Sequence, residues 1–365
     1  SSSARDPAPS AAGDPAPSAA RDTAPSSARD TAPPPLRWGI LSTAKIAREY
    51  LIPAIDAAPH CRVTAVASRD RARAEAFGRD HGIDRCFASY EELIADPDVD
   101  VIYNPLPNHL HAEFTLKAAE AGKHVLCEKP FTMDLPQAER LVADLAELET
   151  GVEVMEGFMY QFHPQWEAVF RLVAEGRIGR PVAVQTWFSY FGDDPNNIRN
   201  IAATGGGALM DIGCYAIHSA RRLFGHEPHR VRGTMEIHPG FGVDVTTSAV
   251  LDFPDGQATF TVSTQSDTDQ RVHIIGTEGR IEITRPFNAL ADREMIVRVG
   301  RGLGATYGEP LETFGFGPAD QYAIMVERFA SALLAGEPAP VGLDDAVANM
   351  AVIDAIRRSH GADGQ

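Results

Sequence analysis

The chain has 365 residues, of which 44% are hydrophobic and 23% charged, so it is long enough for two domains and ordinary for a globular protein. Its 50 acidic residues outnumber 33 basic ones, and the formal charge of −17 disfavours nucleic acid and anionic membrane surfaces as partners. No apolar run approaches the roughly 20 residues of a membrane span, and the first residues lack the apolar core of a signal peptide, so we expect a cytoplasmic protein.

The first 35 residues are a low-complexity segment. Between Ala4 and Pro35 a unit of eight residues, rich in Ala, Pro, Ser, Asp and Arg, occurs four times. The unit has no large apolar side chain with which stacked copies could form a core. Residues 1–35 are therefore predicted to be a flexible, partly polyproline-like tail. An arm that docks on a neighbouring subunit is the alternative.

Residues 36–157 alternate between strand-like and helical patterns. Five apolar runs are typical of strands: Trp38–Leu41, Val63–Ala67, Val99–Tyr103, His124–Cys127 and Val152–Met155. Helical stretches, such as those at 46–58 and 112–121, lie between them. This alternation predicts a parallel sheet with helices on both faces.

Residues 158–365 follow a different pattern. One helix and a long strand at 182–190 precede a glycine-led helix. Runs at 248–253, 258–263, 272–275 and 280–283 then alternate as an antiparallel sheet with one solvated face should. We expect a second, α+β domain with a large, mostly antiparallel open sheet. Two closing helices, at 320–334 and 344–358, have apolar residues at helical spacing and are assigned to packing.

The turn after the first strand occupies the place of a dinucleotide-binding fingerprint. Ser42, Ala44 and Ala47 stand where G-x-G-x-x-G/A has its small residues. A tight structural turn is the alternative, but the turn follows the first strand and opens a helix, whose free N–H groups suit phosphate. The first domain is therefore predicted to be a Rossmann dinucleotide-binding domain.

The second strand ends in Ser68-Arg69, with no carboxylate at its tip to bind ribose hydroxyls. A hydroxyl and a guanidinium suit a 2′-phosphate instead, and Arg69 could also stack on adenine. NADP is the expected cofactor, with NAD as the alternative. A solvated surface charge is the other interpretation of Arg69.

Two later loops fall at strand ends, where ligands bind in open α/β sheets. The fourth strand leads into N-P-L-P-N-H-L-H-A-E (104–113), and the fifth into C-E-K-P (127–130). Together with S-T-A-K-I-A and A-S-R, these motifs resemble the Gfo/Idh/MocA oxidoreductase family, named for glucose-fructose oxidoreductase and inositol dehydrogenase. The resemblance extends from Arg37 to Arg358.

Two segments of the second domain extend the resemblance. The stretch E-G-F-M-Y-Q-F-H-P-Q (156–165) is similar to the family's passage into its second domain, although Gln161 replaces an expected arginine. The stretch G-G-G-A-L-M-D-I-G-C-Y (205–215) resembles its catalytic helix, on which Asp211 and Tyr215 share a face. Tyrosine at 215 is typical of the branch that includes glucose-fructose oxidoreductase, NADP-dependent xylose dehydrogenase and dihydrodiol dehydrogenase.

The resemblance implies roles for individual residues. The expected catalytic residues are Lys129, Tyr215 and Asp211; the expected cofactor contacts are Leu41, Ser42, Thr43, Ala44, Lys45, Ile46, Ser68, Arg69, Pro105, Leu106, Asn108, His111, Glu128 and Lys129; the expected substrate contacts are Lys129, Tyr160, Asn197, Arg199, Asp211 and Tyr215. We expect the Lys129 ammonium to lower the pKa of Tyr215 so that the phenol can accept a proton, and His111 to cap the helix that follows it. Alone, Lys129 would usually be a solvated charge and Tyr215 a core aromatic.

No metal is expected. His109 and His111 form H-x-H without further ligands at metal spacing, and the four cysteines stand singly, which indicates a reducing compartment.

The sequence therefore predicts an NADP-dependent oxidoreductase that transfers a hydride between nicotinamide and a sugar or sugar-like polyol, as an aldose 1-dehydrogenase does. The alternatives are an NADPH-dependent reductase of a nucleotide-linked keto-sugar, for which a basic patch would supply countercharge, and a non-catalytic sugar or NADP sensor. The resemblance also implies a homodimer or homotetramer.

Overall fold

The computed structural model describes residues 34–302, 308 and 310–362, which belong to one compact unit. All but two residues of the predicted tail, 1–35, lie outside the described residues. Within the described part, no helix is long and apolar enough to cross a membrane.

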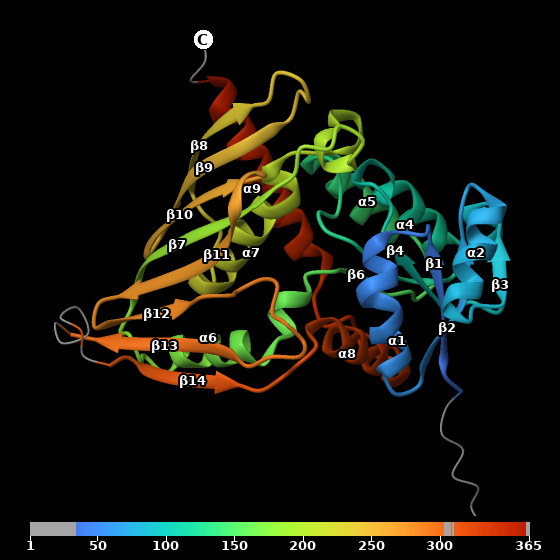
Figure 1. Cartoon of the computed structure of the whole chain (residues 1–365), viewed down its shortest axis with the longest axis horizontal. Helices are drawn as coiled ribbons and strands as arrows, with labels where there is room; N and C mark the ends of the chain where they lie inside the picture. The colour runs from blue at the N-terminus through green and yellow to red at the C-terminus, as the bar shows by residue number, and fades with distance from the viewer. Residues whose placement is uncertain (1–33, 303–307, 309, 363–365) are drawn as a thin grey trace, which may run out of the picture. The chain divides into compact units, whose positions relative to one another are not determined.

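The first sheet has six parallel strands in the order β3-β2-β1-β4-β5-β6 (Figure 1). The order reverses between β1 and β4, and ligands bind at such a reversal, beyond the carboxyl ends of the strands. The strands are β1 (Leu36–Leu41), β2 (Cys61–Ala67), β3 (Arg85–Phe87), β4 (Val101–Asn104), β5 (His124–Cys127) and β6 (Val154–Glu156).

Short polar side chains begin several helices of this domain. Asp70, Ser89 and Asp134 each accept a hydrogen bond from an N–H in the first turn, and so stabilise a group that has no partner inside the helix. The helices are α1 (Ile52–Ala57), which follows a π-helical turn at Ala47–Leu51, α2 (Arg71–His81), α3 (Tyr90–Ile94), α4 (His111–Glu120) and α5 (Leu135–Ala146).

The second sheet has eight strands in the order β14-β13-β12-β11-β7-β10-β9-β8. Its central strand β7 pairs in parallel with β10, and all its other pairs are antiparallel. The strands are β7 (Pro181–Phe191), β8 (Arg230–Ile237), β9 (Asp244–Phe253), β10 (Gly256–Ser263), β11 (Gln265–Gly276), β12 (Gly279–Ile283), β13 (Met295–Arg301) and β14 (Glu312–Phe316).

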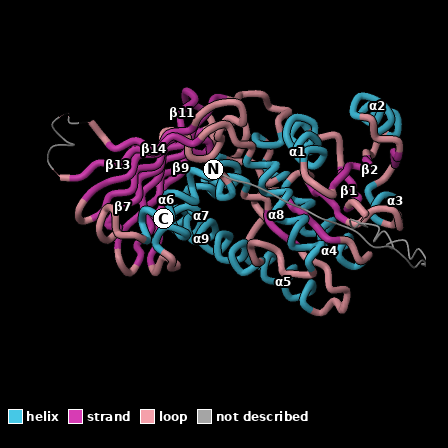
Figure 2. The backbone as a smooth tube through the Cα atoms, turned by 90° about the horizontal axis from the view of Figure 1, so that it is seen from below, coloured by secondary structure: helices cyan, strands magenta, loops and turns pink. Residues whose placement is uncertain are grey.

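The two faces of this sheet differ in chemistry. Helices α6 (Pro164–Ala174), α7 (Cys214–Phe224) and α9 (Leu343–Ala362) lie along one face, and Figure 2 shows them beside the strands. Val184 and Phe188 of β7 are buried on that face. On the other face, hydroxyl groups pair across strands, as in the 2.8 Å bond between Ser248 and Thr261. This alternation is what an antiparallel sheet with one solvated face requires.

The last helices connect the two sheets. Phe329 of α8 (Gln321–Ala335) packs edge-on against Trp38 of β1, with ring centroids 6.2 Å apart. Further along, Asp354 of α9 accepts a hydrogen bond from the N–H of Leu135 at the start of α5. The end of the chain thus completes the packing of its beginning.

The predicted alternation of strands and helices in the first half, and the predicted mostly antiparallel sheet in the second half, are confirmed in the described chain. Strand β5 coincides with its predicted run, and β7 extends the prediction by one residue at each end. The sequence patterns missed β3, β8, β13 and β14. Strand β3 is only three residues long, and β8 has charged or half-buried residues along most of its length.

Candidate active site

Lys129 follows β5, at the carboxyl edge of the first sheet. Its ammonium donates to the main-chain carbonyl of Asp211 at 2.6 Å and to the carboxylate of Asp211 at 3.1 Å. Lys129 is only 10% exposed, so the ion pair lies largely out of water. Burial would lower the pKa of Lys129, but Asp211 outweighs it and the net pKa is raised. The lysine is therefore an ammonium at neutral pH.

Asp211 accepts hydrogen bonds from three side chains. Lys129 donates to Oδ1, while the Tyr190 hydroxyl and Arg199 Nε donate to Oδ2 at 2.7 and 2.9 Å. Burial would raise the pKa of Asp211, but the cations of Arg199 and Lys129 and the Tyr190 hydroxyl hold it well below its usual range. The cluster combines a permanent carboxylate with two cations.

The helix that bears Asp211 begins after three glycines, and its first turn is π-helical, at Leu209–Gly213. Gly207 has a φ of 116°, and a Cβ there would lie 2.1 Å from Asp244 Oδ1. Glycine allows this approach, and Asp244 then accepts a hydrogen bond from the Leu209 N–H at 2.7 Å. π-Helical turns occur frequently at functional sites, and here one carries the residue that holds Lys129.

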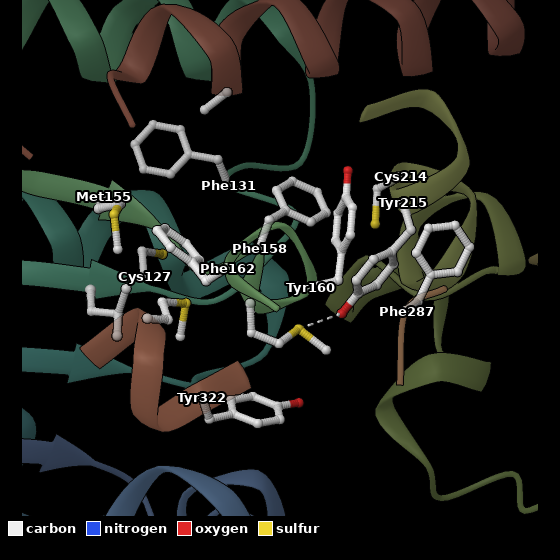
Figure 3. Packing of buried hydrophobic residues seen from close by; sticks show 14 of the residues in the cluster. Cys127, Phe131, Met155, Phe158, Tyr160, Phe162, Cys214, Tyr215, Phe287 and Tyr322 are labelled. Atoms are coloured by element: carbon white, nitrogen blue, oxygen red, sulfur yellow. Dashed lines mark hydrogen bonds between the residues drawn. The ribbon is translucent and has the colours of Figure 1, made fainter. Parts of the chain in front are cut away.

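Tyr215 packs among aromatic side chains that include Phe158, Tyr160 and Phe287 (Figure 3). Its hydroxyl donates to Met159 Sδ at 3.5 Å, and its ring packs at 5.2–5.8 Å from four neighbouring aromatic rings: Phe158, Tyr160, Phe188 and Phe287. The Lys129 ammonium lies over the ring, 5.1 Å from its centroid, rather than at the hydroxyl. Burial raises the pKa of Tyr215 well above its usual value, so the expected lowering by Lys129 is wrong for this arrangement.

Tyr160, predicted as a substrate contact, is fully buried and is not brought to the charged cluster. Its hydroxyl is hydrogen-bonded to His218, whose other ring nitrogen lies 2.7 Å from Asp345. The neighbouring Gln161 is also buried, and its Nε2 has no hydrogen-bond partner among the described residues.

The loop after β7 brings one of its two candidate substrate contacts to the cluster. Arg199 forms the ion pair with Asp211. Asn197 instead caps the turn Ile198–Asn200, because its Oδ1 accepts a hydrogen bond from the Arg199 N–H at 3.1 Å.

The turn after β1 presents small residues and helix N–H groups. Ser42 has a φ of 78°, and its N–H donates to the Ala67 carbonyl at 2.9 Å, which fixes the turn against β2. The helical residues begin at Lys45, which is exposed and pairs with Glu49. The first N–H groups of a helix lack partners inside it and favour an anion. The predicted contacts Leu41, Ser42, Thr43, Ala44, Lys45 and Ile46 all lie on this turn.

The tip of β2 has an arginine and a hydroxyl without a free carboxylate. The nearest acidic residue, Asp70, accepts a hydrogen bond from the Arg73 N–H and caps α2. The Ser68 hydroxyl accepts one from the Asp70 N–H at 3.3 Å, while Arg69 is exposed. A carboxylate occupied as a helix cap is not poised to bind ribose hydroxyls.

His111 links the two loops that carry the remaining cofactor candidates. Its ring nitrogens lie 2.7 and 2.8 Å from the carbonyls of Leu106 and Pro130. No side chain caps α4, so the expected capping role of His111 is wrong. Burial lowers the pKa of His111 to about 4, while the contacts with the two carbonyls oppose this shift. The imidazole thereby holds the loop that includes Pro105 and Leu106 against the Lys129 loop.

Asn108 and Glu128 also support the loops. Asn108 Nδ2 donates to the Gly205 carbonyl at 2.8 Å, which ties the first domain to the glycine run of the second. Glu128 is buried and accepts hydrogen bonds from the Tyr103 hydroxyl at 2.7 Å and the Lys129 N–H at 3.3 Å. Among the described residues, no group of three or more His, Cys, Asp or Glu could hold a metal ion.

Sequence reasoning missed Tyr190, which belongs to no motif. The alternation of side chains between the two faces of β7 could have indicated it. Tyr190 lies on the same face as Phe188, which contacts Tyr215.

The fold and site together define a two-domain, dinucleotide-dependent oxidoreductase. Residues 36–158 match the model of an oxidoreductase family with an NAD-binding Rossmann fold, and residues 166–282 match the GFO/IDH/MocA C-terminal domain. The chain belongs to the Gfo/Idh/MocA oxidoreductase family.

Three relatives illustrate the similarity. An uncharacterized oxidoreductase of Rhizobium meliloti is 44% identical, covering 89% of this chain and 96% of the relative. A D-xylose 1-dehydrogenase (NADP⁺) of Haloferax volcanii is 41% identical, covering 89% and 97%. The crystal structure of a 3-ketoreductase from Actinomadura kijaniata, in complex with NADP and TDP-benzene, is 34% identical with a TM-score of 0.82, covering 89% and 98%.

Proposed function

We propose that the protein is an NADP-dependent sugar oxidoreductase of the aldose 1-dehydrogenase type, acting on a pyranose such as xylose or glucose. The observation that carries the proposal is the Lys129–Asp211 ion pair, which joins the edge of the dinucleotide-binding sheet to the helix that bears Tyr215. The 41% identity to a D-xylose 1-dehydrogenase supports the same chemistry.

The residues present fit NADP. The helix that starts at Lys45 offers N–H groups for the diphosphate, and Ser68 and Arg69 offer a hydroxyl and a guanidinium for the 2′-phosphate. The loops with Pro105, Leu106, Asn108, His111, Glu128 and Lys129 would flank the nicotinamide half. When bound, the nicotinamide supplies the hydride acceptor or donor.

The protein's own groups would manage the proton and the charge. The Lys129 ammonium polarises the substrate oxygen at which negative charge develops. The Tyr215 hydroxyl donates a proton to that oxygen during reduction, and the Tyr215 phenolate accepts it during oxidation. Asp211 fixes Lys129 and accepts a hydrogen bond from a substrate hydroxyl.

A nucleotide-linked keto-sugar is the second candidate substrate, because a dTDP-3,4-didehydro-2,6-dideoxy-α-D-glucose 3-reductase of Actinomadura kijaniata is 35% identical. A nucleotide diphosphate needs countercharge. Arg199 is already paired with Asp211, and Asp193 and Asp194 are exposed in the same loop. This charge balance favours a neutral sugar. The cluster of Lys129 and Asp211 beside Tyr215 argues against a non-catalytic sensor.

We also propose that the protein is a homo-oligomer in the cytoplasm. The hydroxyl-rich face of the second sheet would join copies of the chain into a homodimer or homotetramer. Cys61, Cys86, Cys127 and Cys214 are free thiols, which suits the reducing cytoplasm.

A spectrophotometric screen tests the function. NADP⁺ reduction is followed with free aldoses, polyols and diols, and NADPH oxidation with keto-sugars in parallel. Activity with free aldoses is expected, and activity with nucleotide-linked keto-sugars alone would establish the second candidate instead.

A further inference from the structure

Tyr190 is the residue of the cluster to which no role has been assigned. It lies near the end of β7, half-buried, on the face that packs against the helices. Its hydroxyl donates to Asp211 Oδ2 at 2.7 Å, and Arg199 Nε donates to the same oxygen at 2.9 Å. Burial raises the pKa of Tyr190, so the phenol stays protonated and keeps this hydrogen bond.

The three side chains retain hydrogen-bonding capacity. A phenol oxygen that donates once can still accept, and Oδ1 of Asp211, with Lys129 as its one side-chain donor among the described residues, can accept again. The Arg199 side chain is 46% exposed, and Asp211 is its one side-chain partner in the described part of the chain, so its Nη groups are available as donors. Two acceptors thus lie beside a forked donor.

This combination matches two neighbouring hydroxyl groups. Each hydroxyl donates one hydrogen bond and accepts others, so a vicinal diol can donate to Tyr190 and Asp211 while accepting from Arg199. A phosphate group only accepts hydrogen bonds, and its negative charge would be repelled by the carboxylate of Asp211. An isolated hydroxyl would use only part of the set.

We propose that Tyr190 is a specificity-determining residue, which together with Asp211 and Arg199 binds the adjacent hydroxyls next to the reacting carbon of a sugar. The inference rests on the proposed function for the position of that carbon beside Lys129. For an aldose oxidised at C1, the hydroxyls are those on C2 and C3.

The test removes the Tyr190 hydroxyl from the protein and, separately, single hydroxyl groups from the substrate. Wild type and Tyr190→Phe are assayed for NADP⁺ reduction with glucose, 2-deoxyglucose and 3-deoxyglucose. In the wild type, removing a hydroxyl of the diol should lower kcat/KM by about 10-fold or more, because buried polar groups are left unpaired. In Tyr190→Phe, kcat/KM for glucose should fall by about 10-fold, mainly through KM, and the penalty for at least one deoxy sugar should shrink.

Two variants control the experiment. Ser359→Ala removes a hydroxyl of α9 that accepts a hydrogen bond from the Gly233 N–H at 3.2 Å, away from the cluster, and should leave the discrimination as in the wild type. Arg199→Lys keeps the charge beside Asp211 but removes the fork, and it should weaken the discrimination even if Tyr190→Phe does not fold.

Calorimetric titration of the enzyme–NADPH complex with the same sugars separates this inference from the proposed function. Oxidation of glucose with equal losses for all three sugars in Tyr190→Phe would overturn the role of Tyr190 and leave the function standing. Tighter binding of glucose than of the deoxy sugars, without oxidation of any aldose, would overturn the proposed function and leave the recognition of the diol standing. A wild type that neither binds nor oxidises these sugars would overturn both.

Discussion

The Lys129 ammonium lies 5.1 Å from the centroid of the Tyr215 ring and donates to the Asp211 carbonyl, while the Tyr215 hydroxyl points to Met159. The cation therefore stabilises the ring face and not a phenolate oxygen. Both groups are protonated at neutral pH, since the pKa of each is raised. The site is poised to donate a proton in reduction, and oxidation requires a base.

Replacing Tyr215 by Phe should lower turnover by about 10²–10⁴-fold, the usual contribution of general acid–base assistance. The change keeps the ring in its aromatic pocket, so NADPH binding, followed by fluorescence titration, should be unchanged. Lys129→Ala should cost at least as much. Full activity of both variants, each folded and binding NADPH, would eliminate the proposed mechanism.

The oxidation rate should rise with pH in the alkaline range. A group must lose its proton before it can accept one, and a raised pKa moves that loss to higher pH. If Tyr215 is the acceptor, Tyr215→Phe removes the rise in kcat. If Lys129 transfers the proton and Tyr215 only positions the substrate, the rise persists at lower amplitude.

Asp211→Asn should lower kcat/KM by about 10–100-fold, because an amide cannot accept from all three donors of the cluster. The main-chain carbonyl of Asp211 still accepts from Lys129 at 2.6 Å, so the lysine keeps one anchor. NADPH affinity should therefore match the wild type in the same titration. A wild-type kcat/KM in Asp211→Asn would show that the carboxylate has no part in the reaction.

Arg69→Ala should raise KM for NADP⁺ by about 10–100-fold and leave KM for NAD⁺ nearly unchanged, because a charge-assisted contact to the 2′-phosphate is lost. Such a contact is equal in ground and transition states, so kcat should stay near wild type. The control is Arg71→Ala, which removes a nearby arginine that pairs with Glu75 at 2.9 Å. Equal use of NAD⁺ and NADP⁺ by the wild type would refute the assignment of Ser68 and Arg69.

Glu156→Gln should stabilise the protein at alkaline pH. Burial, with a further contribution from Asp345, raises the pKa of Glu156 to about 8 from its ordinary 4.5. The folded state therefore holds this proton more tightly, and its stabilising contribution is lost as pH rises from 4.5 through 8.

Melting temperatures measured between about pH 5 and pH 9 test the direction of this pH dependence. Glutamine still accepts the hydrogen bond that the Phe131 N–H donates to Glu156 at 2.8 Å, but it does not titrate. The wild type should lose several degrees relative to Glu156→Gln on the alkaline side. The exposed Glu147→Gln should follow the wild type, and parallel curves for wild type and Glu156→Gln would contradict the assignment.

The first sheet could be predicted because buried strands such as β4 and β5, although only four residues long, carry continuous apolar runs. Strands β13 and β14 were missed since neither has a run typical of a fully buried strand. The parallel pairing of β7 with β10 depends on contacts distant in sequence, which local patterns do not encode.

Motifs located the candidate site more reliably than they indicated where its side chains point. Lys129 and Arg199 both form ion pairs with Asp211. Tyr160 and Glu128 instead bond to buried partners, which are provided by elements distant in sequence. The same limitation hid Tyr190, whose position next to Asp211 arises only when β7 packs on the glycine-led helix.

The contact between Trp38 and Phe329 has a consequence for synthesis. The ribosome releases β1 and α1 early, but α8, which covers them, is made near the end of the chain. The first domain therefore completes its core only after most of the second has been translated, although domains generally fold in order as they emerge. A chain that stops before Gln321 leaves an apolar surface open beside β1, which exposes it to chaperones and proteases.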